Sequence, residues 1–178
     1  RNSVMADIMF AGIGGQGVLT AGKILIKIAA AHGKNVCWTS EYSAEMRGGS
    51  ALCRVVVSDE DIGTPYPQVL DILCCMTEGT YDQYIGSVKD GGTVIVNKSL
   101  FGERKYPENV KVYGVDAMEI AAKANPRGAN IAVLGAMIKA TELMKAEEFE
   151  KTLHDYYEKK GPGNVECFKL GYETAEKL

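Results

Sequence analysis

The sequence predicts a single α/β domain with a mostly parallel sheet flanked by helices and a helical C-terminal part. Three observations support this prediction. Strand-like and helix-like patterns alternate from the start of the chain, the apolar run at 72–76 is continuous rather than alternating, and helical spacing dominates from residue 130 onward. Because 178 residues suffice for one full-sized core, we assign residues 1–178 to one domain.

The first half of the chain predicts three strands and one helix. Residues 8–11 form a short apolar run, and apolar residues then recur at helical spacing over 17–31. Gly33 follows at the position where a helix commonly ends in a left-handed residue. Two further strands are expected over 35–39 and 51–57.

The second half predicts a strand at 72–76, a turn at 90–92 and mostly helices thereafter. Strands are expected at 93–97 and, as the last one, at 110–115. The helices are expected at 80–87, 117–124, 130–143, 146–159 and 164–176.

The first glycine cluster lies between the first strand and the first helix. Gly12, Gly14 and Gly17 match G-x-G-x-x-G in the strand–turn–helix context typical of a Rossmann-like nucleotide-binding fold. Gly15 and Gln16 complete the cluster. The helix N-terminus presents free N–H groups and partial positive charge, so we favour a ligand or interface role over a merely compact turn.

A second glycine cluster follows the second predicted strand, where we expect the next crossover to begin. It contains Glu45, Arg47, Gly48 and Gly49. In a parallel sheet both clusters would lie at the edge where ligands bind. Arg47 can grip a phosphate or carboxylate with two parallel hydrogen bonds, and Glu45 can hold Arg47 or pair across an interface. The alternative is a solvated turn with a surface ion pair.

A nicotinamide-binding domain is one alternative for this pattern. It places an acidic residue near the end of the second strand, about 20 residues after the glycine motif, to bind the ribose. Glu41 lies near that place but late, and the second glycine cluster has no role in such a domain. The alternative function from the sequence is a stand-alone nucleotide-binding or regulatory module.

The composition excludes several classes of function. A net charge of −3 does not favour nucleic acid or an anionic membrane as a partner, and the apolar runs are shorter than a membrane helix. The five cysteines form no Cys-x-x-Cys motif, which favours reduced core thiols in a cytoplasmic protein over a metal or iron–sulfur site. The chain shows no Ser/His/Asp set, no thiamine-binding metal motif and no Walker lysine, so we do not expect it to catalyse a reaction alone.

A third motif begins the helix expected at 130–143. Pro126 and Arg127 precede it, and Asn130 or a neighbouring residue is the expected cap. The small residues Gly135 and Ala136 give one face of this helix room for tight helix packing or a subunit contact.

Taken in this order, the motifs at 12–17, 42–49 and 128–136 resemble the gamma subunit of 2-oxoacid:ferredoxin oxidoreductases. The resemblance covers nearly the whole chain. It implies a multi-subunit enzyme that decarboxylates a 2-oxoacid, forms an acyl-coenzyme A and reduces ferredoxin. It also implies partner subunits of alpha and beta type, with a ferredoxin-like delta subunit as a further candidate.

The resemblance places thiamine diphosphate, Mg²⁺ and iron–sulfur clusters on the partner subunits and coenzyme A near this chain. The residues carried over by position form two loops: Gly12, Gly14, Gly15, Gln16 and Gly17, then Glu45, Arg47, Gly48 and Gly49. The second loop resembles the 2-oxoglutarate and branched-chain types more than the pyruvate type. It departs from the family's Tyr-Gly-Pro-Glu, which is Tyr-Ser-Ala-Glu at 42–45. An indolepyruvate oxidoreductase subunit is the close alternative.

Overall fold

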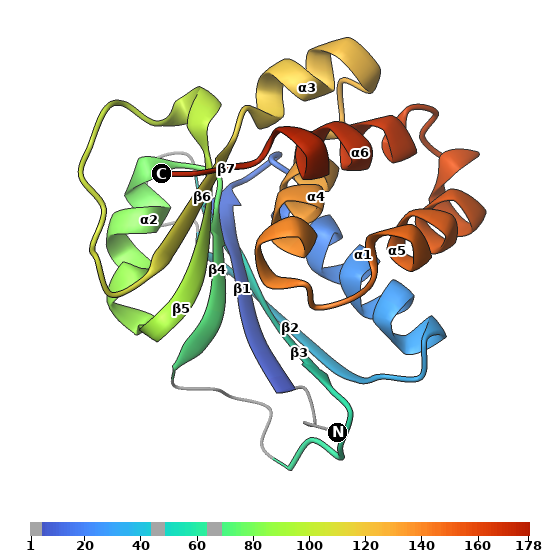
Figure 1. The fold of residues 1–178 in the computed structure, drawn as a ribbon, viewed down its shortest axis with the longest axis horizontal. Helices are drawn as coiled ribbons and strands as arrows, with labels where there is room; N and C mark the ends of the chain where they lie inside the picture. The colour runs from blue at the N-terminus through green and yellow to red at the C-terminus, as the bar shows by residue number, and fades with distance from the viewer. Residues whose placement is uncertain (1–4, 44–48, 64–68) are drawn as a thin grey trace.

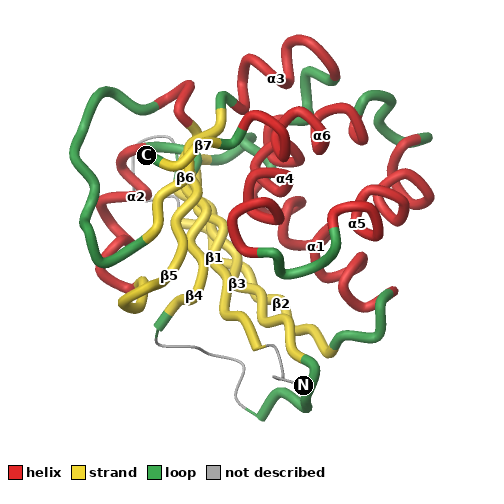
Figure 2. Tube along the Cα trace, viewed as in Figure 1, coloured by secondary structure: helices red, strands yellow, loops and turns green. Residues whose placement is uncertain are grey.

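A seven-stranded mixed sheet forms the centre of the molecule (Figures 1 and 2). The computed structural model describes residues 5–43, 49–63 and 69–178, with only the backbone at 42 and 43. The strand order is β2-β3-β1-β4-β5-β6-β7. The strands are β1 (Met5–Ile13), β2 (Asn35–Ser43), β3 (Ser50–Ser58), β4 (Leu70–Cys75), β5 (Val88–Asn97), β6 (Lys111–Val115) and β7 (Glu176–Lys177).

The parallel core predicted from the sequence is confirmed for β1, β4, β5 and β6, which run side by side in the same direction. Helices cover both faces. They are α1 (Val18–Ala31), α2 (Glu78–Tyr84), α3 (Ala117–Ala124), α4 (Ala129–Thr141), α5 (Ala146–Leu153) and α6 (Asn164–Thr174). Figure 1 shows α2 on one side of the sheet and α1, α4, α5 and α6 on the other.

Alternate side chains of β1 supply two separate apolar clusters. Ile8 and Phe10 pack with α1 and α4, whereas Met9 and Ala11 pack with Tyr81 of α2. All four side chains are buried. This explains why the run 8–11 is apolar without alternation, since both faces of the strand are covered.

The second predicted strand does not lead into a crossover, and that prediction is wrong. β2 and β3 form an antiparallel hairpin with continuous register from Asn35↔Ser58 to Ser43↔Ser50. β3 then pairs antiparallel with β1. Because two reversals restore the direction, β2 still ends at the same edge of the sheet as β1.

The second half of the chain differs from the prediction in three main places. Helix α5 ends at Leu153 and continues as a π-helical turn, His154–Glu158. Helix α6 ends at Thr174, and a further strand, β7, pairs antiparallel with β6. Residues 90–92 lie inside β5 as an irregularity rather than a turn, because Gly91 has a φ of 77° and the pairing with β4 shifts register there.

The small face predicted for the fourth helix is confirmed as a helix-packing surface. A Cβ at Gly135 would lie 2.2 Å from the carbonyl oxygen of Phe168, and a Cβ at Gly171 would lie 2.1 Å from that of Ala132. Helices α4 and α6 therefore touch backbone to backbone, which fixes the position of the α4 N-terminus.

Four of the five cysteines are core residues, and Cys37 is half-buried. Cys53, Cys74, Cys75 and Cys167 are buried, and all five thiols are free. Burial raises the pKa of Cys53 to about 12, so this thiol stays neutral. Within the described ranges, no helix is both long enough and apolar enough to span a membrane.

The pKa of Asp7 on β1 predicts how the stability of this fold depends on pH. Its backbone N–H donates to Asp71 Oδ2 at 2.8 Å, and Asp71 pairs with Lys89. Burial, followed by the negative charge of Asp71, raises the pKa of Asp7. The native state therefore binds this proton more tightly than the unfolded state does, and stability is lost as pH rises through the folded pKa.

We expect Asp7→Asn to raise the melting temperature at pH 7, because the amide removes a poorly solvated charge. Below the ordinary titration range of aspartate the wild-type carboxyl is neutral, so the advantage should vanish there. Thermal unfolding of both proteins between pH 3 and 7 checks this, with exposed Asp61→Asn as the control. If the difference in melting temperature between Asp7→Asn and the wild type grew as the pH fell, the pKa of Asp7 would not be raised in the folded protein.

Candidate functional site

Gly49, the one residue of the second glycine cluster that the structure describes, contacts the first cluster at the carboxyl edge of the sheet. The N–H of Gly14 donates to the carbonyl of Gly49 at 3.0 Å. The hairpin between β2 and β3 is thus tied to the loop after β1. Tyr42 and Ser43 are described only by their backbone, and Glu45, Arg47 and Gly48 lie outside the described residues.

The first loop has the tight geometry predicted for it. Gln16 Oε1 accepts a hydrogen bond from the N–H of Ile13 at 2.8 Å, which closes the loop on itself. A Cβ at Gly12 would lie 2.6 Å from that oxygen. Gly17 caps α1 with a left-handed φ of 75°, and Gly15 is also left-handed at 86°. Glycine is required here for conformation and for close approach.

The loop lies at a topological switch point of the sheet. β1 and β4 are parallel neighbours, yet the helices that follow them pack on opposite faces. In open α/β sheets ligands bind outside the strand ends at such a point, where the departing connections leave a crevice.

A cavity of about 440 Å³ occupies this position. Its walls come from the glycine loop, the first turn of α1, the residue after β4 and the starts of α3 and α4. The lining residues are Gly15, Gln16, Gly17, Thr20, Met76, Met118, Pro126, Arg127, Ala129 and Asn130. The cavity therefore brings together the first and third sequence motifs, which are more than a hundred residues apart.

Two helix N-termini open onto this cavity. Gly17 and Gly128 cap α1 and α4, and neither helix has a side-chain cap or an acidic residue in its first turn. The four other α-helices of the described chain each carry a glutamate in the first turn, at Glu78, Glu119, Glu147 with Glu148, and Glu166. The positive ends of α1 and α4 are therefore left without a negative partner from their own first turns.

Arg127 adds a full positive charge and was not among the residues predicted for the site. Its side chain is exposed at the cavity, and no ion pair or hydrogen bond of its guanidinium occurs within the described ranges. Its backbone N–H donates to Asn125 Oδ1 at 3.0 Å, and Asn125 in turn donates to Asn164 Oδ1 at 2.7 Å. The sequence feature that could have indicated Arg127 is its position after Pro126 and just before a helix.

Of the two predicted alternatives for the cap of α4, the structure has a neighbouring residue and not Asn130 itself. The helix begins one residue earlier, and Gly128 is the cap. Asn130 lies inside the first turn, is 6% exposed, and donates from Nδ2 to the carbonyl of Gly17 at 3.1 Å. The side chain of Asn130 therefore binds the start of α1, whereas local capping rules predict that it caps α4.

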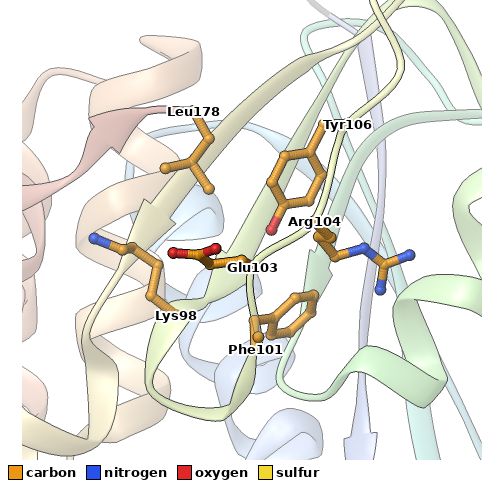
Figure 3. A pocket seen from close by; sticks show the side chains of 7 residues that line it. Lys98, Phe101, Glu103, Arg104, Tyr106 and Leu178 are labelled. Carbon is orange, nitrogen blue, oxygen red and sulfur yellow. The ribbon is translucent and has the colours of Figure 1, made fainter.

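A second cavity, of about 480 Å³, lies beside the loop after β5 and the C-terminal residue Leu178 (Figure 3). Its two cations are already paired. Lys98 contacts Glu176, and Arg104 Nη2 lies 2.7 Å from Asp82 Oδ1. Figure 3 shows the guanidinium of Arg104 turned away from the other labelled side chains. This cavity is therefore less suited to an anion than the one at the glycine loop.

The comparisons with known proteins agree with the motifs. The sequence profile of the pyruvate ferredoxin/flavodoxin oxidoreductase family matches residues 7–174. The chain belongs to this family. Within the oxidoreductase family it is a gamma-type subunit of a 2-oxoacid:ferredoxin oxidoreductase, an enzyme of several subunits.

Two relatives match this chain over almost their full length. The chain is 37% identical over 183 residues to the 2-oxoglutarate synthase subunit KorC of Methanocaldococcus jannaschii, covering 100% of this chain and 98% of that one. The crystal structure of the keto/oxoacid ferredoxin oxidoreductase gamma subunit from Geobacter sulfurreducens is similar with a TM-score of 0.82, at 28% identity, over 96% of this chain and 95% of that one.

A third match shows the same fold within a longer chain. It is 2-oxoglutarate:ferredoxin oxidoreductase from Magnetococcus marinus with 2-oxoglutarate, coenzyme A and succinyl-CoA bound. The TM-score is 0.78 at 23% identity, over 95% of this chain and 30% of that chain. The gamma-type fold of the oxidoreductase family thus also occurs as part of a larger polypeptide.

Proposed function

We propose that this chain supplies the coenzyme A-binding and subunit-contact loops of a 2-oxoacid:ferredoxin oxidoreductase. The phosphate groups of coenzyme A would lie at the glycine loop, between the N-termini of α1 and α4 and beside Arg127. The whole enzyme would decarboxylate a 2-oxoacid oxidatively, form the acyl-coenzyme A and reduce ferredoxin.

One observation carries the proposal: the only two described α-helices without a first-turn acid converge on the same cavity. This cavity is also lined by the exposed Arg127, whose guanidinium has no partner among the described residues. Backbone N–H groups at helix N-termini bind phosphate oxygens well, and the dipole favours the negative charge. Arginine adds paired hydrogen bonds to phosphate. The named coenzyme A complex of the Magnetococcus relative supports this choice of anion.

The second glycine cluster is proposed to complete the site. Gly49 already contacts the first loop, so the segment that precedes it starts from the same edge. We propose that Glu45, Arg47, Gly48 and Gly49 contact coenzyme A or the partner subunit, with Arg47 as the second cation.

The chemistry is proposed to occur on partner subunits of alpha and beta type. Among the described residues, no group of three or more histidine, cysteine, aspartate or glutamate side chains is arranged to hold a metal ion, so the described residues do not fit an iron–sulfur cluster. We propose that thiamine diphosphate, Mg²⁺, the iron–sulfur clusters and the pocket for the 2-oxoacid lie on the partner subunits, as the resemblance to gamma subunits implies.

The substrate is proposed to be of the 2-oxoglutarate or branched-chain type. The sequence Glu-Met-Arg-Gly-Gly at 45–49 and the full-length similarity to a 2-oxoglutarate synthase subunit support this.

A nicotinamide site finds less support in the fold. Glu41 lies on β2, which is separated from β1 by β3, whereas a dinucleotide site uses an acid on a strand next to the glycine motif.

Reconstitution from separately purified subunits tests the proposal. We expect this chain alone to reduce no ferredoxin, and the assembled enzyme to do so only with both 2-oxoacid and coenzyme A. Adenosine 3′,5′-bisphosphate should compete with coenzyme A, since it carries the 3′-phosphate and the first of the two 5′-phosphates of coenzyme A. Tight binding of NAD(H) by the isolated chain, with no competition by the bisphosphate in the assembled enzyme, would favour the nucleotide-binding alternative.

A further inference from the structure

Asn130 links two helices that the sequence separates widely. It is buried in the first turn of α4 and lines the cavity at the glycine loop. Its Oδ1 accepts from the N–H of Ile131 at 3.0 Å, and its Nδ2 donates to the carbonyl of Gly17 at 3.1 Å. The neighbouring donor and acceptor fix the orientation of the amide, because only one orientation satisfies both.

Gly17 supplies the carbonyl oxygen that accepts the hydrogen bond from Asn130. Its carbonyl also accepts from the N–H of Ala21 inside α1 at 2.9 Å, so a hydrogen bond to Gly17 acts on the first turn of that helix. A Cβ at Gly17 would lie 2.8 Å from Nδ2 of Asn130. The starts of α1 and α4 therefore touch through one amide and one glycine.

We propose that Asn130 is a positioning residue that holds the N-termini of α1 and α4 at the separation at which both face the same anion. This inference rests on the proposed function. Asn130 acts through Gly17 on the loop that would bind phosphate. A residue at this place must donate toward α1 and accept from α4, and asparagine does both in the available space.

Aspartate is the informative replacement. It keeps the size of asparagine and the acceptor for Ile131. Its ionised form cannot donate to Gly17, and it places a negative charge where the ligand phosphate should bind. A carboxylate in the first turn of a helix is favourable for the helix itself, so Asn130→Asp separates the loss of positioning from a loss of helix stability.

Asn97 provides a matched control. It is also fully buried, and its Oδ1 accepts from the N–H of Ala117 at the start of α3 at 3.2 Å. Its Nδ2 has no hydrogen-bond partner among the described residues, and Asn97 does not line the cavity. Asn97→Asp makes the same chemical change at another helix start.

The experiment is the coenzyme A dependence of the assembled enzyme, measured as KM and kcat, with melting temperatures of the variant chains. We expect Asn130→Asp to raise the KM for coenzyme A at least tenfold, with kcat within twofold of wild type. Asn97→Asp should leave both near wild type. Asn130→Ser, which removes the reach to Gly17 without adding charge, should raise KM in the same direction.

The outcomes separate this inference from the proposed function. An unchanged KM in Asn130→Asp, with a raised KM in Arg127→Met, would overturn the positioning role alone. Unchanged KM in both would overturn the proposed function and the inference with it. If both Asn130 variants failed to fold while Asn97→Asp folded, or if they lowered kcat and left KM unchanged, Asn130 would be a structural residue and the inference would be wrong.

Discussion

Gly171→Ala should destabilise the protein strongly, because it adds a methyl group where two helices touch through their backbones. The new Cβ would lie 2.1 Å from the carbonyl oxygen of Ala132 and 2.8 Å from its carbonyl carbon and Cα. These are backbone atoms of α4, which cannot rotate away as a side chain would. Helices α4 and α6 must separate, and the stacked rings of Phe149 and Phe168, 4.8 Å apart, would lose packing.

Overpacking of this kind costs about 1–3 kcal/mol and occasionally more. Alanine is favoured over glycine by about 1 kcal/mol in a helix interior, which offsets only part of that cost. For a chain of this size, each kcal/mol lowers the melting temperature by roughly 2–4 °C. We therefore expect a lower melting temperature and an earlier urea midpoint for Gly171→Ala.

Gly79→Ala in α2 is the matched control. Its Cβ would meet no heavy atom within 4 Å, so only helix propensity should act and stability should stay equal or rise. Equal stability of Gly171→Ala and wild type would show that α4 and α6 do not touch through their backbones.

Arg127→Met should raise the KM for coenzyme A in the assembled enzyme by about 10- to 100-fold. A hydrogen bond to a charged group contributes roughly 1.5–3 kcal/mol, and each 1.4 kcal/mol corresponds to about tenfold in binding. The kcat at saturating coenzyme A should change little, because a contact made equally before and during the reaction affects binding alone. The fold should be unaffected, since the side chain is exposed and unpaired within the described residues.

Two further variants make this test specific. Arg127→Lys keeps the charge but not the planar pair of donors, so we expect an intermediate KM. Arg104→Met removes one of the two cations of the second cavity, the one that pairs with Asp82 and lies 4.4 Å from the ring centroid of Tyr81. That variant should leave the KM for coenzyme A unchanged. Equal KM values of Arg127→Met and Arg104→Met for coenzyme A would show that Arg127 does not bind coenzyme A.

The sequence alone determined the features that depend on local pattern. Strand β1, the helix after it and the glycine turn between them follow from an apolar run, a 3.6-residue period and G-x-G-x-x-G, all within about 25 residues. Helix α3 has the predicted bounds, Ala117–Ala124, and the small face of α4 follows from Gly135 and Ala136. Each of these features needs only neighbouring residues to specify it.

The tertiary structure decided the features that depend on which strands pair and which helix starts meet. The antiparallel hairpin of β2 and β3 replaced an expected crossover, because the length and apolarity of a strand do not specify its direction. Two residues at Glu176–Lys177 could become β7 only where β6 offered a free edge. Asn130 donates to Gly17 because the fold brings these two residues, 113 positions apart in the sequence, into hydrogen-bond contact. Arg127 lines the same cavity because it precedes the helix that contains Asn130. Such contacts arise from packing of whole elements, and no periodicity within one segment encodes them.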